Sequence, residues 1–230
     1  MMSRRWRHRY SILLVATLLL VSSGRILKFA AESLVCDEQI QPGDAIAMFS
    51  GDRSFDFAAQ AVSDGRAQRI LVFEGRFQWV VHVGALPSSH EIAQQQLVDR
   101  NLNTCQIELL AGPTMNAWDR AARVAAWLDQ HPEGSVVLLC DRFESQKVRF
   151  VLDQVLPVSA SERVRTVGLA DRRFDETNWW KSRTGIKSFV GAMLGLVHTH
   201  LVGLPPPVKS GSWDPVEYER KLARQMDMAS

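Results

Sequence analysis

The stretch that decides the fold, residues 44–73, reads DAIAMFSGDRSFDFAAQAVSDGRAQRILVF. The apolar run 45–49 predicts a short strand, and residues 55–63 predict a helix that stops at Gly65. The run RILVF at 69–73 predicts a second strand. A strand, a helix and a strand in this order indicate a βαβ unit, in which the two strands are parallel.

The same alternation continues along the chain. Further strands are expected at 105–110, 135–140 and 164–169, and helices at 91–100, 114–130, 143–155 and 182–201. The segment 78–83 is either a strand or a covering segment. Continuous apolar runs such as SVVLLC at 135–140 are typical of strands buried on both faces. The sequence therefore predicts an α/β fold, a Rossmann-like three-layer sandwich with a mainly parallel sheet.

The N-terminus resembles a targeting segment. Its basic leader contains Arg4, Arg5, Arg7 and Arg9. Residues 11–23 (SILLVATLLLVSS) follow as an uncharged, mostly apolar run, a pattern typical of a signal peptide or a signal anchor. We expect a retained single-pass anchor in the cytoplasmic membrane, with the domain facing the periplasm or the cell exterior. Cleavage after the imperfect small-residue site at 21–23 is the alternative.

The expected organisation has four parts. Residues 1–31 form the N-terminal signal anchor, 32–43 a polar linker ending in Pro-Gly, 44–203 the α/β domain, and 204–230 a Pro-rich tail with a short helix. Thr114 is expected to be the N-cap of the helix 114–130, because a threonine oxygen can accept backbone N–H groups there.

Charge and cysteine content exclude several classes of function. The formal net charge is +2 and the basic residues beyond the leader are dispersed, so no nucleic-acid partner is indicated. Cys36, Cys105 and Cys140 have no metal-ligand spacing. We expect Cys105 and Cys140 to be buried beside strands and Cys36 to be a free thiol in the linker. A single disulfide between two of the three cysteines is the alternative. His198 and His200 do not share a helix face, so no metal site is predicted there. The sequence does not identify a cofactor.

Candidate site residues follow the expected strands, because ligands of open α/β sheets bind at the carboxyl ends of the strands. The ligand-binding candidates are Gly51, Asp52, Arg53, Glu74, Gly75, Thr114, Asp141 and Arg142. Arginine can hold a phosphate or carboxylate bidentately, and Arg142 follows the most apolar strand, so it is the first candidate for an anion contact. Asp52, Asp141 and Glu144 are candidate acid/base groups. The alternative is that these residues are only the solvated edge of a sheet.

Trp179 and Trp180 precede the last expected helix. They either pack against that helix, stack on a sugar ring, or lie at a membrane interface.

The stretch 43–75 resembles the opening of the ElyC/SanA/YdcF-type domain of unknown function. It has an aspartate, a hydrophobic strand, a glycine turn, a helix and a strand ending in glycine. LLCDRFESQKVRF at 138–150 and DRRFDETNWWKSRTG at 171–185 are also similar to later pieces of that domain. The resemblance covers about residues 44–203.

The resemblance implies a role in peptidoglycan or surface-polysaccharide biogenesis, in which the protein binds a phosphorylated carrier lipid or sugar. Several polar positions of the family are replaced here. Where the family has a Thr-x-Glu-Asn run, this chain has residues 114–117 (TMNA), and Gly191 or Ala192 stands near the place of a glutamate. Two alternatives therefore stay open: a catalytically degenerate binding or scaffold module, and a hydrolase or transferase that uses the acidic residues at the strand ends.

Overall fold

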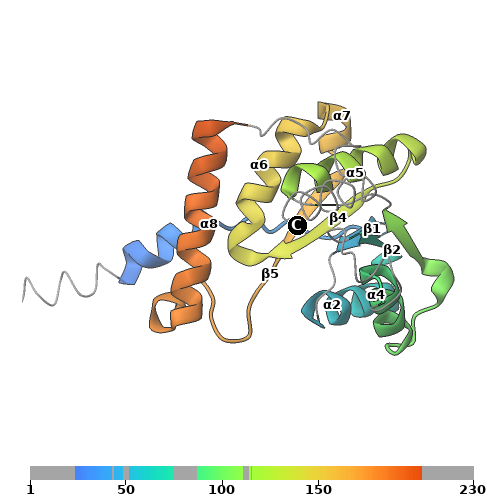
Figure 1. The fold of residues 1–230 in the computed structure, drawn as a ribbon, viewed down its shortest axis with the longest axis horizontal. Coiled ribbons are helices and arrows are strands. Elements are labelled where there is room, and N and C mark those ends of the chain that lie inside the picture. The colour runs from blue at the N-terminus through green and yellow to red at the C-terminus, as the bar shows by residue number, and fades with distance from the viewer. Residues whose placement is uncertain are drawn as a thin grey trace, which may run out of the picture.

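Figure 1 shows helices on both faces of a parallel sheet. This computed structural model describes residues 24–42, 44–48, 52–74, 87–110, 114 and 116–203. The strands are β1 (Asp44–Met48), β2 (Ala67–Phe73), β3 (Ile107–Leu110), β4 (Val136–Asp141) and β5 (Val164–Leu169). Their order across the sheet is β3-β2-β1-β4-β5, and every neighbouring pair is parallel. The predicted α/β fold with a parallel sheet is confirmed and is consistent with a Rossmann-like architecture. The segment 78–83 lies outside the described residues.

Both faces of the sheet are buried because the central strands are apolar at nearly every position. In β1, Ala45 and Ala47 join one core cluster while Ile46 and Met48 join the other. This split follows from the alternation of side chains along a strand. Strand β4 (VVLLCD) divides its apolar side chains between the two clusters in the same way.

The helices divide between the two faces. On one face lie α2 (Asp52–Ser63) and α4 (Ser89–Val98), and on the other lie α5 (Ala117–Gln130) and α6 (Ser145–Val155). The remaining helices are the short α7 (Val158–Ser161), the long α8 (Arg183–Val202) and the 3-10 turns η1 (Thr104–Gln106), η2 (Arg142–Glu144) and η3 (Trp179–Lys181). Crossovers between parallel strands are right-handed. From β1 the chain adds β2 and β3 on one side, and then β4 and β5 on the other side of β1. Because the two directions are opposite, right-handed crossovers place the two sets of helices on opposite faces of the sheet.

The strand order reverses between β1 and β4. In open α/β sheets such a switch point leaves a crevice outside the carboxyl ends of the strands. Helix α2 begins just after the carboxyl end of β1, and β4 ends at Asp141. The fold therefore brings Arg53, in the first turn of α2, to the same edge as Asp141.

A buried ion pair closes the opposite, amino end of the sheet. Asp44 is fully buried, and its carboxylate oxygens lie 2.8 and 2.9 Å from Nη1 of Arg165 on β5. The backbone N–H of Gln41 donates to the same carboxylate at 2.7 Å, and the hydroxyl of Ser135 donates to it as well. These partners compensate the carboxylate for its loss of water. The pair ties the central strand β1 to the edge strand β5.

A third core cluster lies beside α8, outside the layers of the sheet. Ala31 and Leu34 are buried in it, together with Trp179 and Phe189. The rings of Trp179 and Phe189 stack with centroids 3.8 Å apart, and the indole N–H donates to the carbonyl of Leu27 at 3.3 Å. Of the three interpretations of Trp179, packing against the last helix is therefore the one that the structure supports.

The expected linker is fastened to the domain. The backbone N–H of Glu38 donates to the carbonyl of Thr166 at 2.9 Å, and the Thr166 N–H donates to the Glu38 carboxylate at 2.7 Å. The Cys36 N–H donates to the hydroxyl of Ser145 at 2.8 Å. These hydrogen bonds hold residues 36–38 against β5 and the start of α6.

The predicted start of α5 is wrong. The helix begins at Ala117, and its N-cap is Asn116, whose side chain accepts the N–H groups of Trp118 and Asp119 at 2.8 and 3.0 Å. Thr114 is not the N-cap, because a second residue with a capping side chain stands two positions later.

The cysteine prediction is also wrong in one respect. Cys105 is exposed, because residues 104–106 form the turn η1 ahead of β3 and are not part of the strand. Cys36 and Cys140 are partly buried, and all three thiols are free. Burial raises the pKa of both the Cys36 and the Cys140 thiol.

Candidate functional site

A cavity of about 130 Å³ lies at the carboxyl ends of β4 and β5. Three of the predicted site residues, Arg53, Asp141 and Arg142, line it. It is smaller than the roughly 300–1,000 Å³ of pockets that enclose drug-sized ligands. Its size therefore suits a headgroup or a single sugar unit better than a whole nucleotide.

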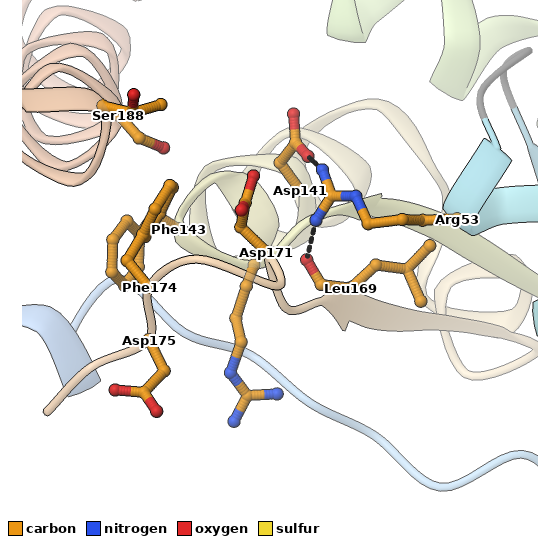
Figure 2. Close-up of a pocket in the computed structure, with 10 residues that line it drawn as sticks. Arg53, Asp141, Phe143, Leu169, Asp171, Phe174, Asp175 and Ser188 are labelled. Carbon is orange, nitrogen blue, oxygen red and sulfur yellow. Dashed lines mark hydrogen bonds and ion pairs between the residues drawn. The ribbon is translucent and has the colours of Figure 1, made fainter. Parts of the chain in front are cut away.

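Arg53 reaches over the ends of both strands. Its Nη2 lies 2.8 Å from a carboxylate oxygen of Asp141, and its Nη1 donates to the carbonyl of Ala170 at 2.7 Å and, at 3.3 Å, to that of Leu169. Figure 2 shows this guanidinium at one side of the cavity, with the two dashed contacts to Asp141 and Leu169. The two backbone contacts hold the guanidinium in place independently of the carboxylate.

The bond between Arg53 and Asp141 is exchangeable. The side chain of Asp141 is 63% exposed and that of Arg53 35% exposed. Ion pairs this open to water contribute about 0–1 kcal/mol. An incoming phosphate can therefore replace the carboxylate of Asp141 on the guanidinium at small cost.

Asp171, at the start of the loop after β5, lines the cavity with a carboxylate that is ionised at neutral pH. Its carboxylate accepts hydrogen bonds from the side chain and the backbone N–H of Arg173, at 2.9 to 3.0 Å. These bonds from Arg173 lower the pKa of Asp171 to about 2, although partial burial opposes them and Arg53 assists them. This carboxylate is therefore an acceptor of hydrogen bonds at neutral pH and not a proton donor.

The remaining walls combine apolar and hydroxyl groups. Phe143 and Phe174 lie on the side of the cavity away from Arg53, with ring centroids 5.8 Å apart. Thr184 and Ser188 of α8 complete the lining. Arginine, carboxylates, hydroxyls and a phenylalanine wall together match a ligand that carries both a phosphate and sugar hydroxyl groups.

The guanidinium of Arg142 already forms ion pairs with two carboxylates of the same chain. Its Nη1 lies 3.0 Å from the carboxylate of Asp37, and its Nε donates to Glu176. Burial opposes the charge of Arg142, but the bonds to Glu176 and Asp37 outweigh it, and the pKa of the guanidinium is raised. Arg142 thus fastens segment 32–42 to the loop after β5, and Arg53 is the better candidate for an anion contact.

The other predicted residues do not line this cavity among the parts that the structure describes. The backbone carbonyl of Glu74 accepts hydrogen bonds from the N–H and the hydroxyl of Thr114, which joins the ends of β2 and the segment before α5. Glu144 pairs with Lys147 at 3.1 Å. Asp52 begins α2 at the expected edge, while Gly51 and Gly75 lie outside the described residues.

Sequence reasoning missed seven of the ten residues that line the cavity. Phe143, Phe174, Thr184 and Ser188 come from a turn, a loop and a helix that packs back onto the sheet edge. Arg120 of α5 lies outside the lining of the cavity. Burial lowers the pKa of its guanidinium, and Glu144, Cys140 and Asp141 act in the opposite direction. No local motif marks these positions, because each is placed by tertiary packing.

Among the described residues, no group of three or more His, Cys, Asp or Glu side chains is arranged to hold a metal ion. One described helix, α8, is long and apolar enough to cross a membrane by length and composition. The predicted anchor run 11–23 and its basic leader lie outside the described part of the chain.

The fold and the cavity define an α/β protein with a candidate small-ligand site at the carboxyl edge of a parallel sheet. No protein-family model matches the chain, and no curated protein has a significantly similar sequence. The likeness to the ElyC/SanA/YdcF-type family therefore stays a prediction from the motifs in this sequence.

Proposed function

We propose that this chain is a membrane-anchored protein of the bacterial envelope that binds a phosphorylated sugar, free or linked to a carrier lipid. Its role would be in peptidoglycan or surface-polysaccharide biogenesis, as the resemblance to the ElyC/SanA/YdcF-type family implies. The observation that carries the proposal is the guanidinium of Arg53, which two backbone carbonyls hold at the mouth of the cavity.

The charges in the cavity favour a sugar phosphate over a bare anion. Asp171 and Asp175 line it with Arg53, and carboxylates repel an anion that brings no other group. The same carboxylates accept hydrogen bonds from sugar hydroxyls. A ligand with one phosphate on Arg53 and hydroxyls on the acidic side satisfies both halves of the site.

The state of the acidic groups in the cavity supports a protein that binds its ligand without catalysing a reaction. The pKa of Asp171 is lowered to about 2, far from the range near 7 that suits a general acid or base at neutral pH. The carboxylate of Asp141 is engaged by Arg53 at 2.8 Å. The hydrolase or transferase alternative has no comparable observation in its favour.

The test is a binding measurement on the full-length chain in detergent, with a hexose 1-phosphate, the free hexose and a polyprenyl phosphate as probes. Hydrogen bonds to a charged group contribute about 1.5–3 kcal/mol. Arg53→Ala should therefore lower the affinity for the hexose 1-phosphate by about tenfold or more. The matched control is Arg66→Ala, which removes an exposed arginine paired with Asp64 at 2.7 Å, away from the cavity.

Binding of the hexose 1-phosphate but not of the hexose supports the proposal. Comparison with the polyprenyl phosphate then separates recognition of the sugar from recognition of the lipid carrier. Equal affinity for the hexose and its phosphate, or equal losses in the two arginine variants, would contradict it.

A further inference from the structure

The outer face of α8 carries a continuous apolar stripe. Its side chains are spaced at i, i+4, i+7, i+8, i+11 and i+15, which places them on one side of a helix. They are between 43% and 80% exposed: Ile186, Val190, Met193, Leu194, Val197 and Leu201. A monomeric soluble protein rarely exposes a contiguous apolar surface of this kind without a partner.

A second face of α8 packs against the domain. Gly185, Phe189 and Ala192 are buried in the third core cluster and its surroundings. Thr184 and Ser188 line the candidate cavity. The helix therefore cannot be surrounded by lipid as a spanning helix is, and the stripe is an exposed apolar face that an external partner can cover.

The charges on α8 fit an anionic lipid surface. Its twenty residues include Arg183 and Lys187 but no aspartate or glutamate. Arg183 continues the line of the stripe at its amino end, and Lys187 flanks it. Helices that lie in a membrane surface combine one apolar face with lysine or arginine at its borders, where the long side chains reach the lipid phosphates.

The chain enters the described structure next to this stripe. Residues 24–32 form a helix beside α8 (Figure 1), and they expose Ile26 (65%) and Phe29 (73%). This helix begins directly after the apolar run 11–23, the proposed membrane anchor. An anchor that ends at residue 23 places α8 near the membrane surface.

We propose that α8 lies in the plane of the membrane, with its apolar stripe in the lipid and Arg183 and Lys187 at the phosphate groups. This inference rests on the anchor in the proposed function and not on the proposed ligand. It places the cavity behind α8, roughly one helix diameter (~10 Å) from the lipid headgroups. A lipid-linked sugar phosphate can reach the cavity from there without leaving the membrane.

The test uses nitroxide labels on the full-length chain in vesicles of phosphatidylcholine and phosphatidylglycerol. Val190→Cys and Gly191→Cys are compared in a background with Cys36→Ser, Cys105→Ser and Cys140→Ala, so that the introduced thiol is the one labelled. The two label sites are about 100° apart around the helix. A Cβ at Gly191 would meet no atom of the described residues within 4 Å, so a cysteine has room there.

The Val190 label should be accessible to oxygen and lose access to a water-soluble nickel complex, while the Gly191 label keeps that access. Equal nickel access at both sites would overturn the inference, because the stripe would then face water. Shielding of Val190 from both reagents would also overturn it, because protein, from a second copy or from residues 11–23, would cover the stripe. Failure of the chain to join vesicles would contradict the anchor as well, whereas a vesicle-bound chain with Val190 in water contradicts only the role of α8.

Discussion

Nη2 of Arg53 lies 2.8 Å from a carboxylate oxygen of Asp141, and the two residues are 88 positions apart in the chain. One follows β1 and the other ends β4, the two central strands between which the strand order reverses. The pair is therefore a direct product of the topology. It places a positive group, exposed enough to be reached, at the edge where α/β sheets bind ligands.

Breaking the buried pair of Asp44 and Arg165 should cost much more stability than breaking an exposed pair. Arg165→Met leaves a fully buried carboxylate without its cation, a loss of about 3–5 kcal/mol. Arg66→Met breaks the exposed pair with Asp64 and should cost about 1 kcal/mol or less. Urea unfolding of both variants measures the difference, and similar midpoints would show that the buried pair does not hold β1 to β5.

Acid should remove the contribution of Asp171 to stability. Its pKa is lowered to about 2 from an ordinary value of 3.8, mainly by Arg173. A carboxyl group with a depressed pKa in the folded state stabilises the fold above its unfolded pKa. This contribution is lost as the pH falls from about 4 to 2.

The expected loss is about 1 kcal/mol or less, because Arg173 is 65% exposed and solvent screens the pair. Unfolding free energies measured across this range should fall less steeply in Asp171→Asn and in Arg173→Gln than in the unchanged chain. An unchanged slope in both variants would rule out this pair as a source of acid sensitivity.

The proposed topology predicts the side of the membrane on which the C-terminus lies. Alkaline phosphatase fused after Ser230 should be active, because this enzyme folds outside the cytoplasm, and a fluorescent protein that folds only in the cytoplasm should stay dark. Removal of residues 1–23 should abolish the phosphatase activity. The opposite pattern of the two reporters would place the domain in the cytoplasm.

The fold was predictable because its central strands are apolar along their length and alternate with amphipathic helices. The run 135–140 predicted β4, and the stretch 44–73 predicted β1, α2 and β2 within a few residues of their bounds. Local competition limited the accuracy of helix starts. Thr114 and Asn116 are both suitable caps, and only the folded chain shows that the second one is used.

The candidate site was predictable only where it follows the ends of strands. That rule brought Arg53, Asp141 and Arg142 to one cavity. It did not show that Arg142 pairs with Asp37, 105 positions away, because that contact depends on how segment 32–42 packs. The wall from α8 could not be predicted either, because nothing in its local sequence shows which face of the helix meets the sheet edge.

The affinity of Asp141→Asn for a hexose 1-phosphate, measured by calorimetry with Arg53→Ala as the reference for loss, tests the central claim most directly. Asp141 competes with a ligand phosphate for Arg53, and a pair this exposed contributes about 0.2–1 kcal/mol. Asp141→Asn should therefore bind the hexose 1-phosphate more tightly than the unchanged chain, by up to about fivefold, with no effect of a chelator. Weaker binding in Asp141→Asn together with loss of binding on chelation would mean that the carboxylate holds a metal ion, and it would contradict an anion site built on Arg53.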